Sequence, residues 1–283
     1  MAAKKKTPVK KKPAKKAAAK PKPKKILPKK ILPKKILKAT PAIKAAAAKS
    51  AKRAAKGARI GKSGYDVPAK KAASKAPAYV TLYGFHLSLP SCKVALMLSM
   101  LGARWNYRHI DLRAGAHKTA DYLKINRYGQ VPALVDGDEV IVQSNVILQY
   151  LADRFGAFGG SAAHEKRRIA EWLAWDLDRM TSVGQARFLR RNAPDSPALP
   201  FVFGRGEQSL ELLDRHLGTA KFLAGPNPTI ADIAVFPWIA TAEEAQYDAG
   251  KYPNIRDWGQ RMMKLPGVAH PYALMPKEDR PVE

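Results

Sequence analysis

The spacing of hydrophobic residues changes along the chain, and from Tyr79 onward it predicts regular structure. The run YVTLYGF is rich in β-branched and aromatic residues and predicts a buried strand. The segment SCKVALMLSMLG after it has apolar residues at helical spacing and ends at Gly102, which is typical of a helix closed by glycine. Strand, turn and helix in this order predict the opening of a βαβ unit.

The pattern that follows predicts the rest of a small domain. NYRHIDL predicts a second strand, and HKTADYLKIN predicts a short helix. Residues 133–135 and 140–142 are apolar runs separated by Asp-Gly-Asp, a sequence typical of a β-hairpin turn. SNVILQYLADRFG then predicts a helix that begins at Ser144 and stops at Gly156. Residues 79–156 are therefore expected to form one domain with the element order βαβαββα.

The remaining apolar residues recur at helical spacing, which predicts an all-α domain over residues 161–275. In NPTIADIAVF, Thr229 precedes a helix and Asp232 follows three residues later, so the pair predicts a capping box with a role in folding, not in catalysis. The residues expected in the core, with the tryptophans placed there and not in a substrate site, are Ile169, Trp172, Leu173, Trp175, Leu177, Met180, Leu210, Leu213, Leu217, residues 233–239 with Trp238, Ile255, Trp258 and Met262.

Residues 1–78 differ from the rest of the chain in charge and complexity. They contain 27 of the 51 Lys and Arg residues but only Asp66 of the 23 acidic residues, so they carry +26 of the net charge of +28. Pro-Lys-Lys-Ile-Leu occurs three times in tandem between Pro23 and Leu37, and its prolines prevent a continuous helix. A self-repelling segment with few aromatic residues cannot bury enough surface to offset its ordering entropy. The sequence therefore predicts a disordered basic tail.

The basic tail favours non-sequence-specific binding to nucleic acid, because flexible lysines neutralise phosphates and release counterions without reading bases. Its composition resembles the Ala/Lys/Pro-rich tails of linker histones and bacterial histone-like proteins. This resemblance implies a nucleoid- or chromatin-associated protein. Two alternatives stay open: a solvated tail without a dedicated partner, and an anionic membrane surface that takes up the Ile-Leu pairs.

The cysteine content and the absence of long apolar runs favour the cytoplasm. A single cysteine, Cys92, excludes an intramolecular disulfide and a cysteine-based zinc site, and no metal is expected. No apolar run approaches the ~20 residues of a transmembrane helix, and the N-terminus lacks the apolar region of a secretory signal. A mitochondrial presequence remains an alternative, although the tail is Lys-rich and interrupted by proline. P-loop, metal-enzyme and acidic-cluster hydrolase motifs are absent.

The order βαβαββα with Pro132 at the start of the hairpin resembles the thioredoxin-like N-terminal domain of glutathione transferases. The resemblance extends over roughly residues 79–275 and implies an α/β domain followed by an all-α domain, a homodimer, and glutathione as co-substrate. In that family the proline follows a cis peptide bond. Such a bond turns the backbone groups of the preceding residue, here Val131, outward, where an extended peptide can pair with them.

The same resemblance implies further glutathione-binding residues. Gln143-Ser144 match an acidic or amide residue followed by serine that receives the γ-glutamyl group, at a helix N-terminus whose free N–H groups suit a carboxylate. An ordinary N-cap role for Ser144 is the alternative. In GAHKTADYLKINRYGQVPAL, His117 matches a histidine that contacts the glycine carboxylate in the theta class, and Gln130 matches a Lys or Gln near that group. Arg127 stands where the family usually has proline.

The segment LYGFHLSLPSCKVALML resembles the theta and zeta classes, and Ser88 then matches their catalytic serine. A thiol with a pKa of ~8.5 is mostly protonated at neutral pH, so a hydroxyl donor and a helix N-terminus are needed to favour the thiolate. Ser88 is also a plausible N-cap, and the two roles are compatible. Cys92 is the alternative reacting group, of a thiol transferase. Tyr83, near the tyrosine of other classes, is interpreted as a core residue.

The sequence therefore predicts a glutathione transferase that reacts the glutathione thiolate with a small electrophile and is tethered to nucleic acid by its tail. The predicted site is compatible with conjugation, glutathione-dependent reduction, dehalogenation or isomerisation. A non-catalytic module of the same fold, used for protein interaction or nucleoid tethering, is the alternative from another functional class.

Overall fold

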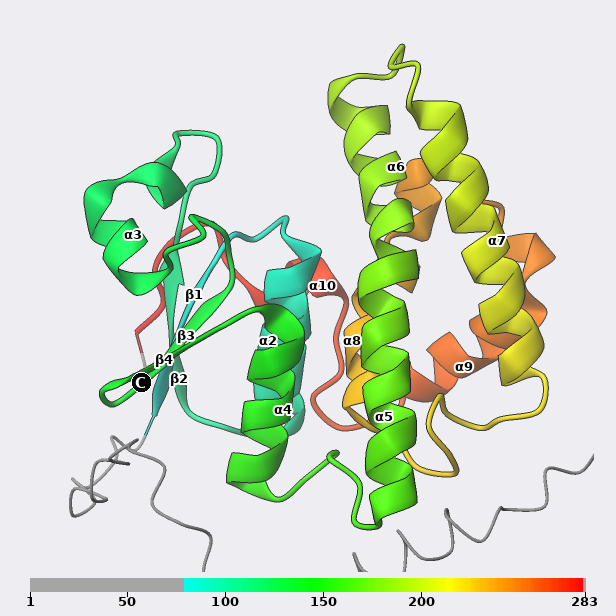
Figure 1. Ribbon diagram of the computed structural model, residues 1–283, viewed down its shortest axis with the longest axis horizontal. Helices are drawn as coiled ribbons and strands as arrows, with labels where there is room; N and C mark the ends of the chain where they lie inside the picture. Colours follow the sequence, from blue (N-terminus) through cyan, green and yellow to red (C-terminus); the bar gives the residue numbers. More distant parts are fainter. Residues whose placement is uncertain (1–78, 282–283) are drawn as a thin grey trace, which may run out of the picture. The chain divides into compact units, whose positions relative to one another are not determined.

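The computed structural model describes residues 79–281, and the basic tail predicted for residues 1–78 lies outside the described residues. Between Tyr79 and Pro281, no helix combines the length and apolar character that crossing a bilayer requires. The described chain forms a four-stranded sheet flanked by helices, followed by a group of helices (Figure 1).

The first half has the thioredoxin-like fold expected from the sequence. Its sheet has the strand order β2-β1-β3-β4. The central strand β1 (Val80–Gly84) pairs in parallel with β2 (Trp105–His109) and antiparallel with β3 (Ala133–Asp136). The hairpin partner of β3 is β4 (Glu139–Val142). A parallel pair needs a crossover, and helix α2 (Leu89–Met100) supplies it.

Helix α2 is buried on nearly all sides, which explains its almost uniformly apolar sequence. It packs against β1, against α4 (Ser144–Phe155) and against helix α8 (Ile230–Ile239) of the second half. In Figure 1, α2 and α4 lie between the sheet and the second group of helices, while α3 (Ala120–Ile125) lies beyond the other side of the sheet. Because α2 packs against elements of both halves of the molecule, its side chains can contact residues of both.

Two predicted elements of the first half differ from the structure. The second strand ends at His109 because the next carboxylate, that of Asp111, accepts hydrogen bonds from the N–H groups of Arg113 and Ala114 and forms a turn. The single helix predicted over HKTADYLKIN is divided into a 3₁₀ turn, η1 (Ala116–Lys118), and α3. Thr119 separates them, because its hydroxyl caps α3 by accepting from the N–H of Tyr122.

The second half is helical, as predicted. The capping box is confirmed: Thr229 caps α8, and Asp232 accepts the N–H of Thr229 at 2.9 Å. The buried Asp232 carboxylate also accepts from Trp258 Nε1 at 3.0 Å, so the box fastens α8 to the last long helix. The helical elements are α5 (Ala163–Trp175), η2 (Asp176–Met180), α6 (Thr181–Asn192), α7 (Leu199–Leu217), α8, η3 (Ala242–Ala245), η4 (Ala249–Lys251), α9 (Pro253–Met263) and α10 (Pro271–Leu274).

The segment η2 between α5 and α6 is a π-helical turn, a rare geometry that is frequent at functional sites. Its first residue, Asp176, is fully buried, whereas Leu177 is 54% exposed. The prediction that Leu177 belongs to the core is therefore wrong, because its side chain borders a cavity described below. Trp172 and Trp175 are only partly buried and pack edge to face, while Trp238 is buried.

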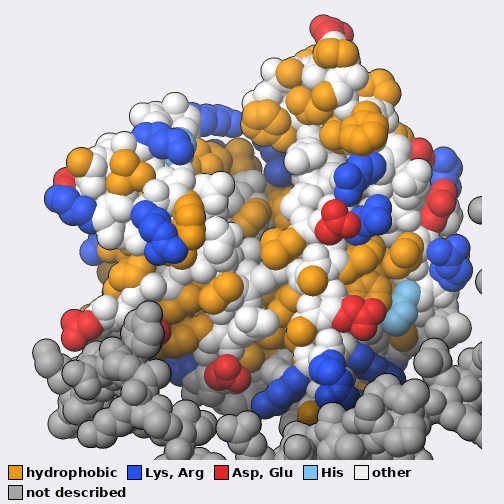
Figure 2. Space-filling view, in the orientation of Figure 1, with side chains coloured by type: hydrophobic (Ala, Val, Ile, Leu, Met, Phe, Trp, Pro, Cys, Tyr) orange, Lys and Arg blue, Asp and Glu red, His pale blue; other side chains and the backbone are white. Residues whose placement is uncertain are grey.

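The surface of the described chain keeps large hydrophobic side chains at one end of α6 and α7. Phe188 on α6 is 61% exposed, and Phe201 on α7 is 69% exposed. Figure 2 shows hydrophobic side chains gathered over the upper ends of these two helices. Exposed aromatic groups of this kind are available to contact a ligand or another chain.

Candidate active site

One cavity of about 510 Å³ brings together every site residue predicted from the sequence. Its walls come from the N-termini of α2 and α4, the segment between α3 and β3, and the helices of the second half. The predicted residues that line it are Ser88, His117, Gln130, Val131, Pro132, Gln143 and Ser144. These residues lie in separate segments of the sequence, so the fold and not the chain order makes the cluster.

Ser88 is the N-cap of α2 and stands at the cavity wall. Its Oγ accepts a hydrogen bond from the N–H of Ser91 at 3.3 Å, and its own N–H donates to the C=O of Phe85 at 2.8 Å. The capping interpretation is confirmed. Because Oγ acts there as an acceptor, the hydroxyl hydrogen remains, and no acceptor for it occurs among the described residues. Ser88 can therefore donate this hydrogen to an anion in the cavity, next to a helix N-terminus.

The Val131-Pro132 peptide bond is cis, as predicted. The segment before it is fixed from the side, because the C=O of Gln130 accepts from Tyr122 Oη at 2.7 Å and from Asn126 Nδ2 at 2.6 Å. Within the described part of the chain, the backbone N–H and C=O of Val131 have no hydrogen-bond partner. Backbone groups of a half-buried residue at a cavity wall can pair with the backbone of an extended ligand.

The loop around Arg127 forms an ordered turn without the proline that the family resemblance implies there. Asn126 Oδ1 accepts the N–H of Tyr128 at 3.1 Å, and Gly129 has a left-handed φ of 56°. A Cβ at Gly129 would lie 3.0 Å from the C=O of His117, so glycine is needed there. Arg127 itself points outward and donates to Tyr128 Oη. Arg127 in place of proline therefore does not disrupt this wall of the cavity.

Gln143 and Ser144 form the turn from β4 into α4. Gln143 occupies the N-cap position with a φ of 71°, which is uncommon for a residue with a side chain and typical of functional turns. Ser144 is the first helical residue and is buried, and its hydroxyl has no hydrogen-bond partner between Tyr79 and Pro281. The alternative of an ordinary N-cap role for Ser144 is therefore not what the structure shows. The hydroxyl and the free N–H groups of α4 are left to bind an anion.

His117 contributes an unsatisfied polar atom to the same cavity. Its Nδ1 is buried and lacks a hydrogen-bond partner among residues 79–281, and His117 lines the cavity. A buried polar atom without a partner is costly, so such an atom indicates a missing ligand or water. Gln130, by contrast, has an exposed side chain at the cavity edge.

Lys93, which lines the cavity, belongs to a buried ion pair that sequence reasoning missed. Lys93 Nζ on α2 lies 2.5 Å from Asp176 Oδ2 of η2, and both side chains are essentially inaccessible. Asp176 also accepts from Trp238 Nε1 at 2.7 Å and from Asn145 Nδ2 at 3.0 Å. Burial lowers the pKa of Lys93, while the Asp176 carboxylate opposes this shift. The signal in the sequence is a single lysine inside the apolar run CKVALML.

The ion pair connects the two halves of the molecule behind the cavity. Lys93 and Asn145 belong to the thioredoxin-like domain, whereas Asp176 and Trp238 belong to the helical domain. Trp238 is held closely on its other side, because a Cβ at Gly184 of α6 would overlap its ring. Lys93 Nζ lies 4.9 Å from the centroid of the same ring. The position of Trp238 at the cavity wall is therefore set by both domains.

Cys92 and Tyr83 lie outside this cavity. Cys92 is fully buried in α2, its Sγ faces the C=O of Pro271 at 3.8 Å, and burial raises the pKa of its thiol to about 12. A reactive cysteine needs the opposite environment, exposed and electropositive. The ring of Tyr83 packs at 6.4 Å from the ring of Tyr122, which agrees with a packing role.

A second cavity of about 560 Å³ adjoins the first and will be called the apolar cavity. The two cavities share Ser88, Pro90, Leu112, Thr181 and Trp238. The remaining walls of the apolar cavity are rich in aromatic and aliphatic groups from the β1–α2 segment and from α6. A group bound at Ser88 would therefore be accessible from both cavities. This arrangement suits a reaction between two molecules that enter from different sides.

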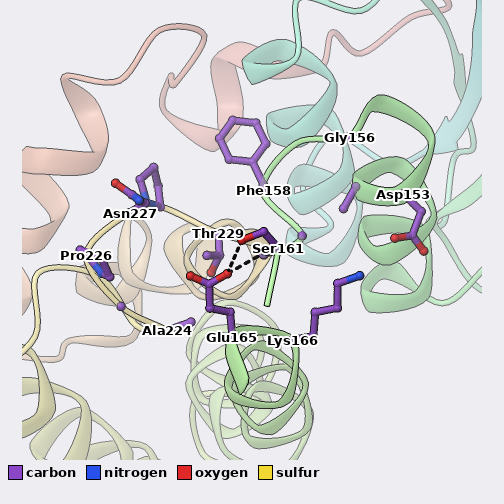
Figure 3. Close-up of a pocket in the computed structure, with 15 residues that line it drawn as sticks. Asp153, Gly156, Phe158, Ser161, Glu165, Lys166, Ala224, Pro226, Asn227 and Thr229 are labelled. Carbon is purple, nitrogen blue, oxygen red and sulfur yellow. Dashed lines mark hydrogen bonds between the residues drawn. The ribbon is translucent and has the colours of Figure 1, made fainter. Parts of the chain in front are cut away.

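A third cavity, of about 490 Å³, lies away from these residues, where the linker after α4 meets the start of α8. Figure 3 shows Glu165 directed toward Ser161 in it. Glu165 Oε2 accepts the N–H groups of Ser161 and Ala162 at 2.8 and 3.0 Å, which lowers the pKa of Glu165 to about 2. The polar groups of this third cavity therefore serve to cap α5. Across residues 79–281, no three His, Cys, Asp or Glu side chains gather as metal ligands would.

Comparison with known protein families agrees with the two halves of the fold. Residues 78–153 match the glutathione S-transferase N-terminal domain, and residues 180–266 match the glutathione S-transferase C-terminal domain. Glutathione S-transferase 3 of Zea mays is 29% identical over 208 residues, which cover 69% of this chain and 94% of the relative. The disulfide-bond oxidoreductase YfcG of Escherichia coli K12 is 27% identical over 188 residues, which cover 62% of this chain and 86% of that protein.

Solved structures give the same result. A glutathione S-transferase from Xanthobacter autotrophicus Py2 is 30% identical with a TM-score of 0.64, and the match covers 68% of this chain and 96% of that one. The glutathione transferase URE2P6 from Phanerochaete chrysosporium, solved in complex with oxidized glutathione, is 25% identical with a TM-score of 0.64; the match covers 69% of this chain and 94% of that one.

Proposed function

Because this chain belongs to the glutathione S-transferase family, we propose that it binds glutathione in the cavity beside Ser88 and joins the glutathione sulfur to an electrophile. The observation that carries the proposal is the convergence of Ser88, His117, Val131 and Ser144 on one cavity. In this proposal residues 79–156 hold glutathione, and residues 161–275 supply most of the surface that receives the electrophile.

The unsatisfied groups of the cavity match the groups of glutathione. The γ-glutamyl carboxylate would bind at Gln143, Ser144 and the N-terminus of α4, where free N–H groups favour an anion. The cysteinyl backbone would pair with the N–H and C=O of Val131, which are free in the described chain. The glycine carboxylate would lie near His117 and Gln130. These contacts would place the sulfur at Ser88.

The thiolate at Ser88 is the nucleophile of the proposed reaction. The Ser88 hydroxyl would donate a hydrogen bond to the sulfur, and the N-terminus of α2 would add positive potential, so both favour the ionised thiol. The thiolate would then form the new bond to the electrophilic atom. In a substitution the leaving group departs with the bonding electron pair; in an alkene addition or epoxide opening the displaced pair moves to the neighbouring carbon or to the oxygen, which takes up a proton. Ser88 stabilises the anion and does not itself attack.

The experiment is a glutathione titration of the full-length protein by calorimetry, followed by a glutathione-dependent activity screen. The panel should contain aryl halides, activated alkenes, epoxides and small disulfides. Disulfides are included because one relative is named a disulfide-bond oxidoreductase, and the same thiolate could attack a disulfide sulfur. Binding with turnover supports the proposal. Binding without turnover of any compound supports the non-catalytic alternative, and absence of binding overturns both glutathione roles.

We also propose that the protein forms a homodimer through the β4–α4 region. Val140 on β4 is 45% exposed and Val146 on α4 is 50% exposed, although both are aliphatic. Light scattering is expected to give twice the chain mass of 31.1 kDa. Val146→Asp is expected to return the mass of one chain, because a carboxylate would be buried unpaired in the interface. The control Met263→Asp, at an equally exposed residue of α9, should remain dimeric. A monomeric parent protein would contradict the proposal.

For residues 1–78 we propose non-sequence-specific binding to nucleic acid in the cytoplasm, because they carry a net charge of +26 while the rest of the chain carries +2. If ~10 phosphates are neutralised, the plot of log affinity against log salt should have a slope near −9. Gel-shift titrations on unrelated DNA sequences would compare the full chain with a chain that begins at Tyr79. Equal affinities would exclude the tail as the binding segment. Tighter binding to anionic vesicles than to DNA would favour the membrane alternative.

A further inference from the structure

The apolar cavity beside Ser88 has an uneven charge distribution at its walls. Three arginines line it, Arg113 from the segment after β2 and Arg187 and Arg191 from α6, whereas no Asp or Glu is among its lining residues. The nearest carboxylate that pairs with them is Glu244, which lies 2.8 Å from Arg187 Nε and 3.2 Å from Arg191. Glu244 pairs with two of the three guanidinium groups, and Asp111 lies within electrostatic range of the third, Arg113. Three positive charges against two carboxylates leave the cavity a positive excess.

The three arginines are not equally available to a ligand. Arg187 is buried, and each of its three nitrogens already donates a hydrogen bond, to Glu244, to the hydroxyl of Tyr272 and to the C=O of Leu87. Arg191 is 39% exposed and makes one contact with Glu244, which leaves most of its donors free. The guanidinium of Arg113 makes no hydrogen bond or ion pair within residues 79–281, although the nearby Asp111 carboxylate, whose Oδ1 accepts two backbone N–H groups of its own loop, feels its charge. Arg113 and Arg191 are therefore the donors for an anion.

The rest of the apolar cavity is suited to a planar apolar group of a ligand. Phe85 and Trp238 are buried in its wall, and Phe188 presents a ring that is 61% exposed. Aromatic walls bind planar groups by stacking and by removal of apolar surface from water. Because Ser88 and Trp238 line both cavities, a planar group bound here would lie next to the proposed position of the glutathione sulfur.

We propose that the electrophile accepted here is an aromatic or similarly planar compound that carries a carboxylate, with the ring against Phe188 and Trp238 and the carboxylate at Arg113 and Arg191. This inference rests on the proposed function, because it concerns the second substrate of the same site. Guanidinium groups bind carboxylates through charge-assisted hydrogen bonds, which a neutral compound of the same shape cannot make. The site therefore selects its electrophile by charge in addition to shape.

The test compares 4-chloro-3,5-dinitrobenzoate with its neutral methyl ester as electrophiles for the full-length protein. In both, the thiolate forms a C–S bond at the chlorinated carbon, the C–Cl bond breaks, and chloride leaves with the electron pair. Each kcat/KM is divided by the uncatalysed rate of the same compound, which removes differences in intrinsic reactivity. We expect the corrected value for the carboxylate to exceed that of the ester by about tenfold, and added salt to reduce the ratio.

Arginine variants test whether Arg113 and Arg191 cause the preference for the carboxylate over the ester. Arg113→Gln and Arg191→Gln should each lower the ratio of carboxylate to ester efficiency several-fold, and the double variant should bring it near one. Arg256→Gln, an exposed arginine on α9 outside this cavity, should keep the parent ratio. A parent ratio near one, or a ratio that survives the double variant, overturns the inference while turnover of the ester still supports the proposed function. Glutathione binding without turnover of either compound rejects the inference, while turnover of another compound of the panel would still support the proposed function.

Discussion

Asp176→Asn is expected to lower the free energy of unfolding by about 3–5 kcal/mol, because it removes one partner of a buried ion pair and leaves the other charged. Lys93 Nζ is 1% exposed and lies 2.5 Å from the Asp176 carboxylate. The same carboxylate satisfies Trp238 Nε1 and Asn145 Nδ2, so its loss affects three partner groups at once. Urea unfolding followed by tryptophan fluorescence measures the difference.

A matched control stands two residues away in the same π-helical turn. Asp178 is 61% exposed and pairs with Arg179 and Arg205 at the surface, so Asp178→Asn should change stability by less than about 1 kcal/mol. The double variant Lys93→Met/Asp176→Leu should recover much of the loss, because no buried charge remains unpaired. Equal effects of Asp176→Asn and Asp178→Asn would contradict the importance of the buried pair.

Ser88→Ala is expected to reduce glutathione-dependent turnover about 100-fold, with much weaker effects on glutathione affinity, because one donor to the developing anion is removed. The pKa of the bound glutathione thiol should rise toward its free value of about 8.5. Activity of the variant should then increase with pH over the range in which the parent is already at its plateau. Ultraviolet titration of the thiolate in the complex and the pH profile of kcat/KM measure both effects.

The capping role of Ser88 requires a control, because Ser88→Ala also removes an N-cap worth about 1 kcal/mol. Thr119 caps α3 with the same geometry, accepting from Tyr122 N–H at 3.3 Å, and does not line the cavity. Thr119→Ala should therefore cost similar stability and leave the thiol pKa in place. If Ser88→Ala leaves that pKa unchanged while Cys92→Ala abolishes turnover, the sulfur chemistry belongs to Cys92.

Much of the fold follows from the sequence, because local signals were strong where single elements begin or end. The hairpin turn, the glycine that closes α4 and the Thr229 capping box are each determined by residues close together in the chain. The cavity residues were reached through family resemblance and not by periodicity, which cannot show that Ser88 and Ser144 meet. Gln143 was not expected at the N-cap position, because its left-handed backbone results from the sharp turn out of β4 and not from residue preference.

The charged groups at the two cavities were missed by sequence reasoning, because they come from segments far apart in the chain. Lys93 is visible in the sequence as a charged residue within an apolar helix, but its partner Asp176 lies 83 positions further along. Arg113 and Arg191 similarly come from unrelated elements and meet only through the packing of α6 against the β1–α2 segment. Helical periodicity sorts residues into inward and outward faces, and it carries no information about which inward charges pair.

The π-helical turn at Asp176–Met180 also bears on how such a site could change during evolution. A π turn holds one residue more than the α-helical turn it replaces, so deletion of a single codon there would restore a regular helix. Each residue of an α-helix advances the chain by about 100° around the axis, since 3.6 residues complete a turn. The whole of α6, with Gly184 and Arg191, would then rotate relative to Asp176, while the thioredoxin-like domain stayed as it is. Deletion of one codon would therefore give the proposed second-substrate site a different wall and leave the proposed glutathione site unchanged.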